Sequence, residues 1–435
     1  MAYELQILHA SDLEGGVDAI DRAPNFAALV DLLEGQAENS ITLSAGDNVI
    51  PGPFFNAALF AEDELFNTTI NDLLNLEEDD SYAALEGGRG RIDIAVMNAI
   101  GFDASTLGNH EFDTGTDTLA GFAFPDLGDS AGVGDDEWTG TLFPYLSANL
   151  DFANDGNLSG LASDQILTPD QQVYGPAESA AGTDASPRLA PVAIIEENGE
   201  RIGVVGATTQ RLETISSPGS TTETTGGEND MAALAQAIQP VIDAMRAEGV
   251  NKIVLASHLQ QIQLEQQLAG LLDGVDVIVA GGSDTLLADE TDQLRSGDTA
   301  DAGYPILTED AGGNPVAIVS TDGEYSYVGR LVVEFDDNGV INPASIDPAA
   351  SGNFATTDAV VSQVAGSEDP FADGSKASIV QELVNGVEGV VAEQDGNTFG
   401  QTQVFLDGRR ESVRTEETNL GNLTADANLA TAQEV

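Results

Sequence analysis

The stretch from Ser105 to Asp113, which reads STLGNHEFD, places several side chains capable of chemistry within a few positions. It holds His110, one of only three histidines in the 435-residue chain, next to Asn109 and three positions before Asp113. A histidine can transfer a proton near neutral pH, and a carboxylate partner can fix its tautomer. A polar turn is the alternative, because Asn and Asp are also common in turns.

Four further short apolar runs lead to side chains that can bind a metal ion. These runs and the residues that follow them are Leu5–Ala10 with Asp12 and Glu14, Ile41–Ala45 with Asp47, Ile253–Ala256 with His258, and Val275–Ala280 with Asp284. The run in the opening stretch, Ala104–Leu107, is the fifth of this kind and precedes Asn109. Apolar runs of this length without alternation are typical of strands buried on both faces. Five such endings exceed the scatter that turn-forming residues alone would produce.

Helical patterns lie between the apolar runs, at Asn25–Leu33, Met231–Arg246 and Leu259–Leu272. Alternation of strands and helices predicts an α/β architecture. In such folds the functional site lies beyond the carboxyl ends of the strands. The polar side chains that follow the runs are therefore expected to converge at one edge of the fold.

The charge balance of the chain is strongly acidic. It contains 14 basic and 74 acidic residues, for a net charge of −60. Such a surface repels nucleic acids and anionic membranes and attracts divalent cations. Only Lys252 and Lys376 are lysines, and an acidic, lysine-poor surface suits a salty medium in which screening weakens self-repulsion. We therefore expect a small-molecule substrate and no nucleic-acid polymer as a partner.

Cysteine is absent, which excludes both a disulfide framework and a thiolate metal site. The first residues, MAYELQILHASDLEGG, show no basic region followed by a long apolar region, so no secretory signal is visible. No apolar run reaches the ~18 residues of a spanning helix, so no membrane span is expected. The charge nevertheless favours an extracellular or cell-surface location.

An ordered set of motifs resembles the calcineurin-like metallophosphoesterases, and within them the bacterial 5'-nucleotidase branch. The motifs are Leu8–Asp12, Ser44–Asn48, Gly108–Asp113, Ser147–Asn149, Gly203–Gly206, Ser257–His258, Tyr327–Leu331 and Val413–Leu423. Any single motif is weak, but the ordered set covers most of the chain and is highly specific. The resemblance implies a four-layer α/β/β/α sandwich followed by a linker and a partial second α/β domain.

The resemblance also implies domain boundaries. Residues 1–345 would form the metallophosphoesterase domain, residues 346–397 a linker with a helix, and residues 398–435 the beginning of a C-terminal substrate-binding domain. This last segment ends before the aromatic residues with which the branch stacks a nucleoside base. Either the segment is a truncated part of a longer chain or base recognition is absent, and we favour the truncated part.

Roles for individual residues follow from the same resemblance. One metal site would use Asp12, Glu14, Asp47 and Asp284, and the other would use Asp47 as a bridge together with Asn109 and His258. His110 and Asp113 would stabilise the transition state or protonate the leaving group, and Arg410 and Arg414 would contact the substrate. Two cations that share an anionic ligand can clamp a phosphate and activate water for in-line attack.

Three positions depart from the family pattern. The first motif is Asp12-Leu13-Glu14 where the family has Asp-x-His, and the late motif is Gly281-Gly282-Ser283-Asp284 where it usually has Gly-His-x-His. The first site therefore becomes an all-oxygen set, which favours Ca²⁺, Mn²⁺ or Mg²⁺ over Zn²⁺. The second site loses one ligand. Because added negative charge lowers the Lewis acidity of a bound metal, we expect slower catalysis or a different metal.

Structural explanations compete for several of these residues. Asp284 could serve as a helix N-cap or form an Asx turn, and Arg410 and Arg414 could pair with neighbouring glutamates. His9 is expected to be structural, inside the first strand. Asp12 and Glu14 can lie on one side of an extended strand, where they would repel each other in the absence of a cation.

Two functional hypotheses remain. The first is metal-dependent hydrolysis of phosphate esters, with nucleotides as the favoured substrates, by a metal-activated water at a one- or two-metal site. The alternative is a catalytically weak or inactive protein with the metallophosphatase fold, which serves as a metal-stabilised extracellular surface or assembly module and can self-associate. The altered ligands and the acidic surface motivate the alternative.

Overall fold

Two β-sheets form the centre of the structure, a computed structural model that describes residues 2–59, 88–125, 138–175, 186–395, 400–413 and 415–434. The first sheet has the order β16 (Ile341–Asn342), β15 (Tyr327–Phe335), β1 (Tyr3–Ala10), β2 (Ser40–Ser44), β3 (Ala104–Thr106), β4 (Tyr145–Leu146) and β7 (Leu189–Ala190), with β17 (Gly352–Ala355) also paired to β15. Strands β1, β2, β3 and β4 are parallel, so their carboxyl ends lie at the same edge.

The second sheet has the order β13 (Ile306–Glu309), β14 (Pro315–Val319), β12 (Val277–Gly281), β11 (Lys252–His258), β9 (Glu200–Thr208), β8 (Val192–Glu197) and β6 (Ile166–Leu167). Its central strands β9, β11, β12 and β14 are parallel. A separate two-stranded ribbon pairs β5 (Leu150–Asp151) with β10 (Thr222–Glu223). The five apolar runs that predicted strands correspond to β1, β2, β3, β11 and β12.

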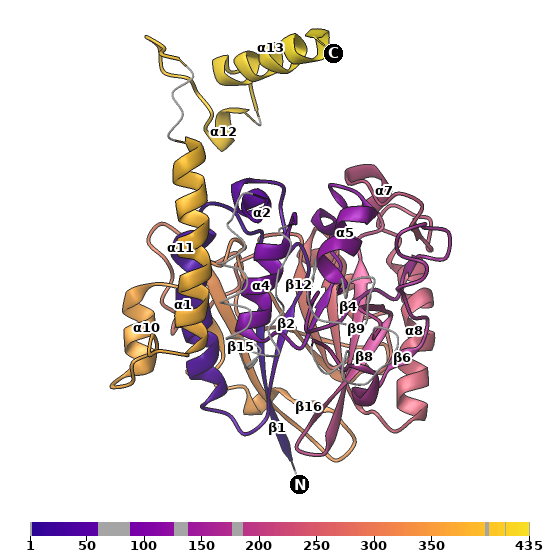
Figure 1. Ribbon diagram of the computed structural model, residues 1–435. Coiled ribbons are helices and arrows are strands. Elements are labelled where there is room, and N and C mark those ends of the chain that lie inside the picture. The colour runs from indigo at the N-terminus through magenta and orange to yellow at the C-terminus, as the bar shows by residue number, and fades with distance from the viewer. Residues whose placement is uncertain are drawn as a thin grey trace, which may run out of the picture. The chain divides into compact units, whose positions relative to one another are not determined.

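Helices cover the outer faces of both sheets. The longer helices are α1 (Ala19–Glu34), α4 (Arg91–Ile100), α5 (Thr116–Ala123), α8 (Met231–Ala247), α9 (Ile262–Ala269), α10 (Asp358–Ala365), α11 (Lys376–Asp395) and α13 (Asn419–Glu434). Short helical turns are α2 (Pro53–Ala57), η1 (His110–Phe112), η2 (Pro169–Gln171), α7 (Leu212–Ile215), η3 (Pro343–Ser345) and α12 (Arg410–Val413). Figure 1 shows α1 and α11 on one side of the sheets and α8 on the other.

Three hydrophobic clusters hold these layers together. Side chains of both sheets, such as Ile7, Leu43, Val204 and Val254, pack against each other in the centre. A second cluster joins the first sheet to α1, α4, α10 and α11, and a third joins the second sheet to α8 and α9. Because a strand covered on both faces must be apolar throughout, the central strands lack alternation. The predicted four-layer α/β/β/α sandwich is confirmed.

The chain divides into two units, residues 1–391 and 392–435, so the first unit extends past the predicted boundary at 345. In the segment predicted as a linker, β17 pairs antiparallel with β15. Val361 of α10 and Leu383 of α11 are buried in the cluster that contains α1. The apolar residues of α11 recur at helical spacing, as at Val380, Leu383, Val384 and Val387, so the sequence predicts the helix but not the surface on which it packs.

The second unit contains the end of α11, α12 and α13, and its described residues, 392–395, 400–413 and 415–434, form no strand. Residues 398 and 399, where the predicted C-terminal domain begins, lie outside the described residues. Apolar side chains such as Phe405, Leu423 and Leu429 are exposed. Within the described part of the chain, no helix combines the length and the apolarity needed to cross a bilayer.

Candidate metal centre and active site

Two groups of potential metal ligands meet where the carboxyl ends of the two sheets come together. Asp12, Asp47 and His258 form one group, and Glu14, Asp47 and His110 form the other; within each group the donor atoms lie within 4.8 Å of one another. Asp47 belongs to both groups. The structure therefore pairs Asp12 with His258 and Glu14 with His110, whereas the predicted ligand sets placed Asp12 and Glu14 together.

The loops that carry these carboxylates adopt unusual backbone conformations. Asp12, Glu14, Asp47 and Asp284 have φ angles of 49°, 38°, 50° and 47°, in the left-handed region that residues with a side chain rarely enter. Such conformations persist where surrounding contacts over-determine them, and they cluster at functional sites. The same four residues are the acidic ones that the sequence predicts as metal ligands.

A close backbone approach brings together the loops that follow β2 and β3. The Asp47 carboxylate lies so near the backbone of Gly108 that a Cβ atom at this position would collide with it. The backbone N–H of His110 then donates to Asp47 Oδ1 at 2.7 Å. Only glycine permits this approach at position 108, which explains why a glycine precedes Asn109 and His110.

His258 is fully buried, and its tautomer follows from its contacts. Its Nδ1 lies 2.8 Å from the carbonyl oxygen of Ala45, and a carbonyl can only accept, so Nδ1 carries the proton. In a neutral ring Nε2 is then an acceptor, yet it lies 3.0 Å from Asp47 Oδ2, which is also an acceptor. Either a second proton or a cation must lie between these atoms. This arrangement fits a metal ligand whose second nitrogen is oriented by a backbone carbonyl.

Without a cation, the ionisation of the cluster is strongly perturbed. Burial lowers the pKa of His258, but the charge of Asp47, its hydrogen bond and the charge of Asp12 raise it to about 10. Burial raises the pKa of Asp12 well above its usual range, an effect that His258 opposes and that Asp47 and Asp284 reinforce. A divalent cation would relieve this repulsion by stabilising the ionised carboxylates.

Glu14 is similarly affected at the more open end of the cluster. Burial raises its pKa, His110 opposes this effect, and Asp47 and Asp284 add to it, with a resulting pKa of about 7. The residue replaces a histidine of the family pattern, so its carboxylate adds a negative charge beside Asp47. The charge and oxygen donors together favour a hard divalent cation at this position.

His110 and Asp113 lie together in the structure. The Nδ1 of His110 is 2.6 Å from Asp113 Oδ2, and Asp113 Oδ1 accepts a hydrogen bond from Ser216 Oγ at 2.8 Å. The other ring nitrogen, Nε2, faces Glu14 Oε1 at 3.4 Å. Burial lowers the pKa of His110, but the hydrogen bond to Asp113 and the surrounding carboxylates raise it to about 9. Asp113 thus holds the ring so that Nε2 points toward the donor groups.

Glu111 is a residue that the sequence analysis did not single out, although it lies in the opening stretch. Its buried carboxylate accepts from the backbone N–H of Gly108 at 2.8 Å, of Asn48 at 2.7 Å and of Asp47 at 3.2 Å. It therefore ties the loop after β2 to the loop after β3. Its position directly after His110 was the only sign of a role in the sequence. No local pattern reveals that it binds backbone groups of two loops.

Asn109 is buried, and its side chain meets a second residue that the sequence analysis missed. Gln260 Nε2 lies 2.6 Å from Asn109 Oδ1 and 3.0 Å from His258 Nε2. The amide of Gln260 therefore links Asn109 to His258. Gln260 was hidden because a glutamine after a strand, within a Gln-rich stretch, carries no recognisable pattern.

Asp284 lies beside the cluster but belongs to neither compact donor group. A Cβ atom on Gly323 would lie 3.1 Å from Asp284 Oδ1 and 3.3 Å from Asp12 Cβ, which places the two acids around one glycine. His9 is buried in β1 and contacts Tyr304 Oη at 2.9 Å, in keeping with a structural histidine. Arg414 and the side chain of Arg410 lie outside the described residues.

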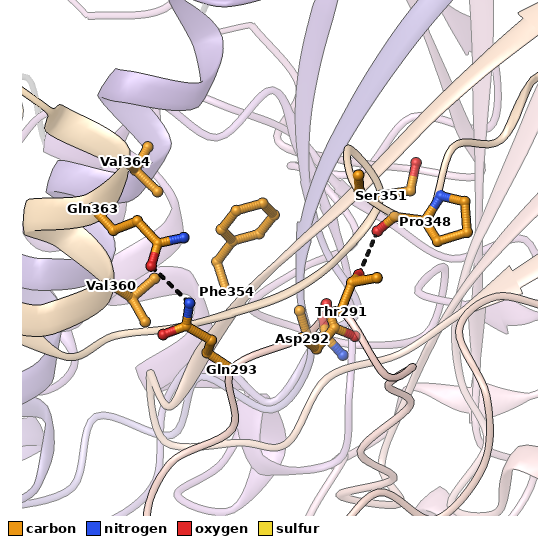
Figure 2. Close-up of a pocket in the computed structure, with 11 residues that line it drawn as sticks. Thr291, Asp292, Gln293, Pro348, Ser351, Phe354, Val360, Gln363 and Val364 are labelled. Carbon is orange, nitrogen blue, oxygen red and sulfur yellow. Dashed lines mark hydrogen bonds between the residues drawn. The ribbon is translucent and has the colours of Figure 1, made fainter.

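A pocket elsewhere in the structure has no connection with these residues. Its volume is about 210 Å³, and it lies between the 291–293 segment and the β17–α10 region. Figure 2 shows it bounded by hydrogen bonds from Thr291 to Pro348 and between Gln293 and Gln363. None of the predicted catalytic or metal-binding residues lines this pocket. The candidate site is therefore the cluster of donor groups at the carboxyl ends of the strands.

Comparison with known proteins gives a nucleotide phosphoesterase and 5'-nucleotidases among the relatives. No protein-family profile matches the chain. A trifunctional nucleotide phosphoesterase, YfkN of Bacillus subtilis, is 28% identical over 436 residues, which cover 99% of this chain and 24% of the relative. A snake venom 5'-nucleotidase of Gloydius brevicauda is 26% identical over 429 residues, covering 98% and 58%. The chain thus spans less than two thirds of the length of these curated relatives.

The fold has solved counterparts. A 5'-nucleotidase precursor from Thermus thermophilus superposes with a TM-score of 0.64 at 24% sequence identity, and the match covers 99% of this chain and 68% of that structure. At this identity the match supports the architecture. Sequence relatives and architecture agree with the ordered motifs. The resemblance is confirmed: the chain is similar to calcineurin-like metallophosphoesterases of the 5'-nucleotidase type.

Proposed function

We propose that this protein hydrolyses phosphate monoesters with the help of divalent cations, and that nucleotides are its substrates. The relatives are named as nucleotide phosphoesterases and 5'-nucleotidases, which supports the substrate class. The observation that carries the proposal is the position of Asp47, which is shared by two donor groups and faces His258 Nε2 at 3.0 Å. A shared carboxylate is what a pair of neighbouring cations requires.

The residues that would hold the cations are Asp12, Glu14, Asp47, Asn109, His258 and Asp284. Bound divalent cations would supply Lewis acidity, polarising a phosphoryl oxygen and a nearby water molecule. We propose Mn²⁺, Mg²⁺ or Ca²⁺ rather than Zn²⁺, because most donors are oxygens and Glu14 replaces a nitrogen donor.

His110 is proposed as the group that assists departure of the leaving oxygen. Its Nδ1 is held by Asp113, so Nε2 is the nitrogen that faces the donor groups. From there a proton on Nε2 could pass to the leaving oxygen or stabilise charge on the phosphoryl group. Ser216 supports the arrangement by donating to Asp113.

The remaining parts of the proposal concern the second unit and the setting. We propose that residues 398–435 begin a substrate-binding domain and that Arg410 and Arg414 contact the phosphate, since guanidinium groups bind phosphate in a bidentate manner. A net charge of −60 supports an extracellular or cell-surface location. Self-association is proposed only as part of the scaffold alternative.

Hydrolysis of 5'-AMP and p-nitrophenyl phosphate tests the proposal. Purified protein is stripped with a chelator, and activity is measured after addition of Mn²⁺, Mg²⁺, Ca²⁺ or Zn²⁺. We expect activity that requires the cation and that falls in Asp47→Asn, while Asp243→Asn, an exposed change on α8, serves as the matched control. If wild type is inert with every cation yet is stabilised by them, the scaffold alternative replaces the enzyme proposal.

A further inference from the structure

The donor group around Asn109 and His258 has a glycine where the family pattern has a ligand. Gly282 adopts a φ of +81°, and a Cβ atom there would lie only 2.8 Å from His258 Nε2. The same Cβ atom would lie 2.9 Å from Gln260 Nε2. The space beside His258 that a side chain at position 282 would enter is therefore taken by the side chain of Gln260.

The backbone of Gln260 supports a specific role for this residue. Its φ angle is +76°, in the region that favours glycine, yet a long side chain stands there. Position 282, by contrast, is a glycine. Left-handed residues with side chains persist where function or dense contacts retain them. The side chain beside His258 therefore comes from Gln260, after β11, and not from position 282, after β12.

We propose that Gln260 is a metal ligand, binding through its amide oxygen Oε1 together with Asp47, Asn109 and His258. The inference deepens the proposed function, because it rests on the metal centre proposed above. It assigns to Gln260 the place that Gly282 leaves without a donor. An amide oxygen also suits the hard cations that the other donors favour.

The contacts of the amide explain how the ligand would work. Gln260 Nε2 contacts Asn109 Oδ1 and His258 Nε2, and both of these atoms are proposed cation ligands. In the absence of a cation, the NH₂ end of the amide donates a hydrogen bond to Asn109 Oδ1. Rotation about the last side-chain bond exchanges the two ends of an amide, so the oxygen can face a cation from the same position.

A competing role for Gln260 makes the opposite prediction. If its NH₂ group permanently replaced the cation as hydrogen-bond donor, the chain would bind one ion fewer. Removing the side chain would then open the site and strengthen cation binding. The ligand role requires that the same change weaken binding.

Direct measurement of Mn²⁺ binding distinguishes the two roles. The full chain is stripped with EDTA, and bound Mn²⁺ is counted by equilibrium dialysis with metal analysis, and by the loss of the free-ion EPR signal. We expect two Mn²⁺ per chain in wild type, with the Kd of the weaker site raised at least tenfold in Gln260→Ala and Gln260→Gly. Gln261→Ala is the matched control, because Gln261 is the exposed neighbour and its side chain makes no capping bond.

Gln260→Gly also guards against misfolding, because glycine relieves the left-handed backbone and should leave unfolding in EDTA no easier than in wild type. Equal or tighter Mn²⁺ binding by Gln260→Gly would overturn the ligand role, while cation-dependent hydrolysis by wild type would leave the proposed function intact. Wild type that binds no Mn²⁺ would overturn both.

Discussion

His258 Nε2 lies 3.0 Å from Asp47 Oδ2, although the proton of the neutral ring is committed to Ala45 through Nδ1. Two acceptors at hydrogen-bond distance require a proton or a cation between them. In the absence of a cation the ring itself must become charged, which agrees with its pKa of about 10. The relationship explains why the protein should respond to divalent cations both in stability and in activity.

Cation binding should stabilise the fold. The carboxylates of Asp12, Glu14 and Asp47 repel one another, and a bound cation removes this repulsion. At a free Mn²⁺ concentration of one hundred times Kd, we expect about 2.7 kcal/mol of added stability. Thermal unfolding in EDTA and in Mn²⁺ measures it, and Asp47→Asn should lose most of the difference. An unfolding temperature that is the same in EDTA and in Mn²⁺ would contradict the proposed metal centre.

Removal of His110 should reduce turnover far more than substrate binding. General acid catalysis contributes roughly 10²–10⁴-fold, so we expect His110→Ala to lower kcat by about that factor. Asp113→Asn should have a smaller effect in the same direction, because it removes the anion that holds Nδ1. Steady-state kinetics with added Mn²⁺ provide the measurement. Unchanged kcat in both variants would exclude this role for the pair.

Glu111→Gln should disturb the loops that carry the proposed ligands. Its carboxylate accepts from the backbone N–H groups of Gly108, Asn48 and Asp47, and an amide would turn one acceptor into a donor facing a donor. We expect a loss of about 1–3 kcal/mol in the free energy of unfolding. Urea unfolding in EDTA measures the effect on the fold, and Mn²⁺ titration measures the effect on the site. A variant as stable as wild type would show that Glu111 does not hold the loops.

The stability of the protein should fall as the pH rises through the neutral range. Glu265 of α9 is fully buried, and burial, only partly opposed by its own backbone hydrogen bond and by the charge of His258, raises the pKa of its carboxyl to about 8. Its pKa is near 4.3 in an unfolded chain, so the folded state binds the extra proton between these values. Stability from the neutral carboxyl is complete below about pH 4 and declines toward pH 8.

Glu265→Gln removes this titration, so its unfolding free energy should change less with pH than that of wild type, by on the order of a few kcal/mol between pH 5 and pH 9. Urea unfolding across this range in EDTA gives both curves. Glu213→Gln, a change at an exposed residue of α7, serves as the control and should follow wild type. Parallel curves for wild type and Glu265→Gln would refute the prediction.

Metal preference should depend on residue 14. Replacing the carboxylate in Glu14→His supplies the nitrogen donor of the family pattern and removes a negative charge. We expect Zn²⁺ affinity to rise at least tenfold relative to Mg²⁺. Competition titrations with the two ions provide the ratio, and Asp18→Asn, at a nearby exposed residue, should leave it unchanged. An unaltered ratio would show that residue 14 does not contact a cation.

The sequence by itself determined the architecture and the kind of chemistry. Uninterrupted apolar runs such as Ile253–Ala256 predict buried strands because burial on both faces is a local property of a segment. Parallel strands in turn place their following residues at one edge, so Asp47, Asn109 and His258 were predicted to meet. The pairing of His110 with Asp113 was also visible, because the two lie within one turn.

Only the tertiary structure decided how the donors group and what supports them. Asp12 faces His258 and Glu14 faces His110 in loops whose backbones are left-handed at both acids. No residue pattern predicts these backbone conformations. Glu111 and Gln260 act on groups contributed by other loops, and such partners depend on distances between distant segments. The extent of the first unit, to residue 391, was likewise decided by packing of α10 and α11, because a helical pattern does not show which surface the helix will cover.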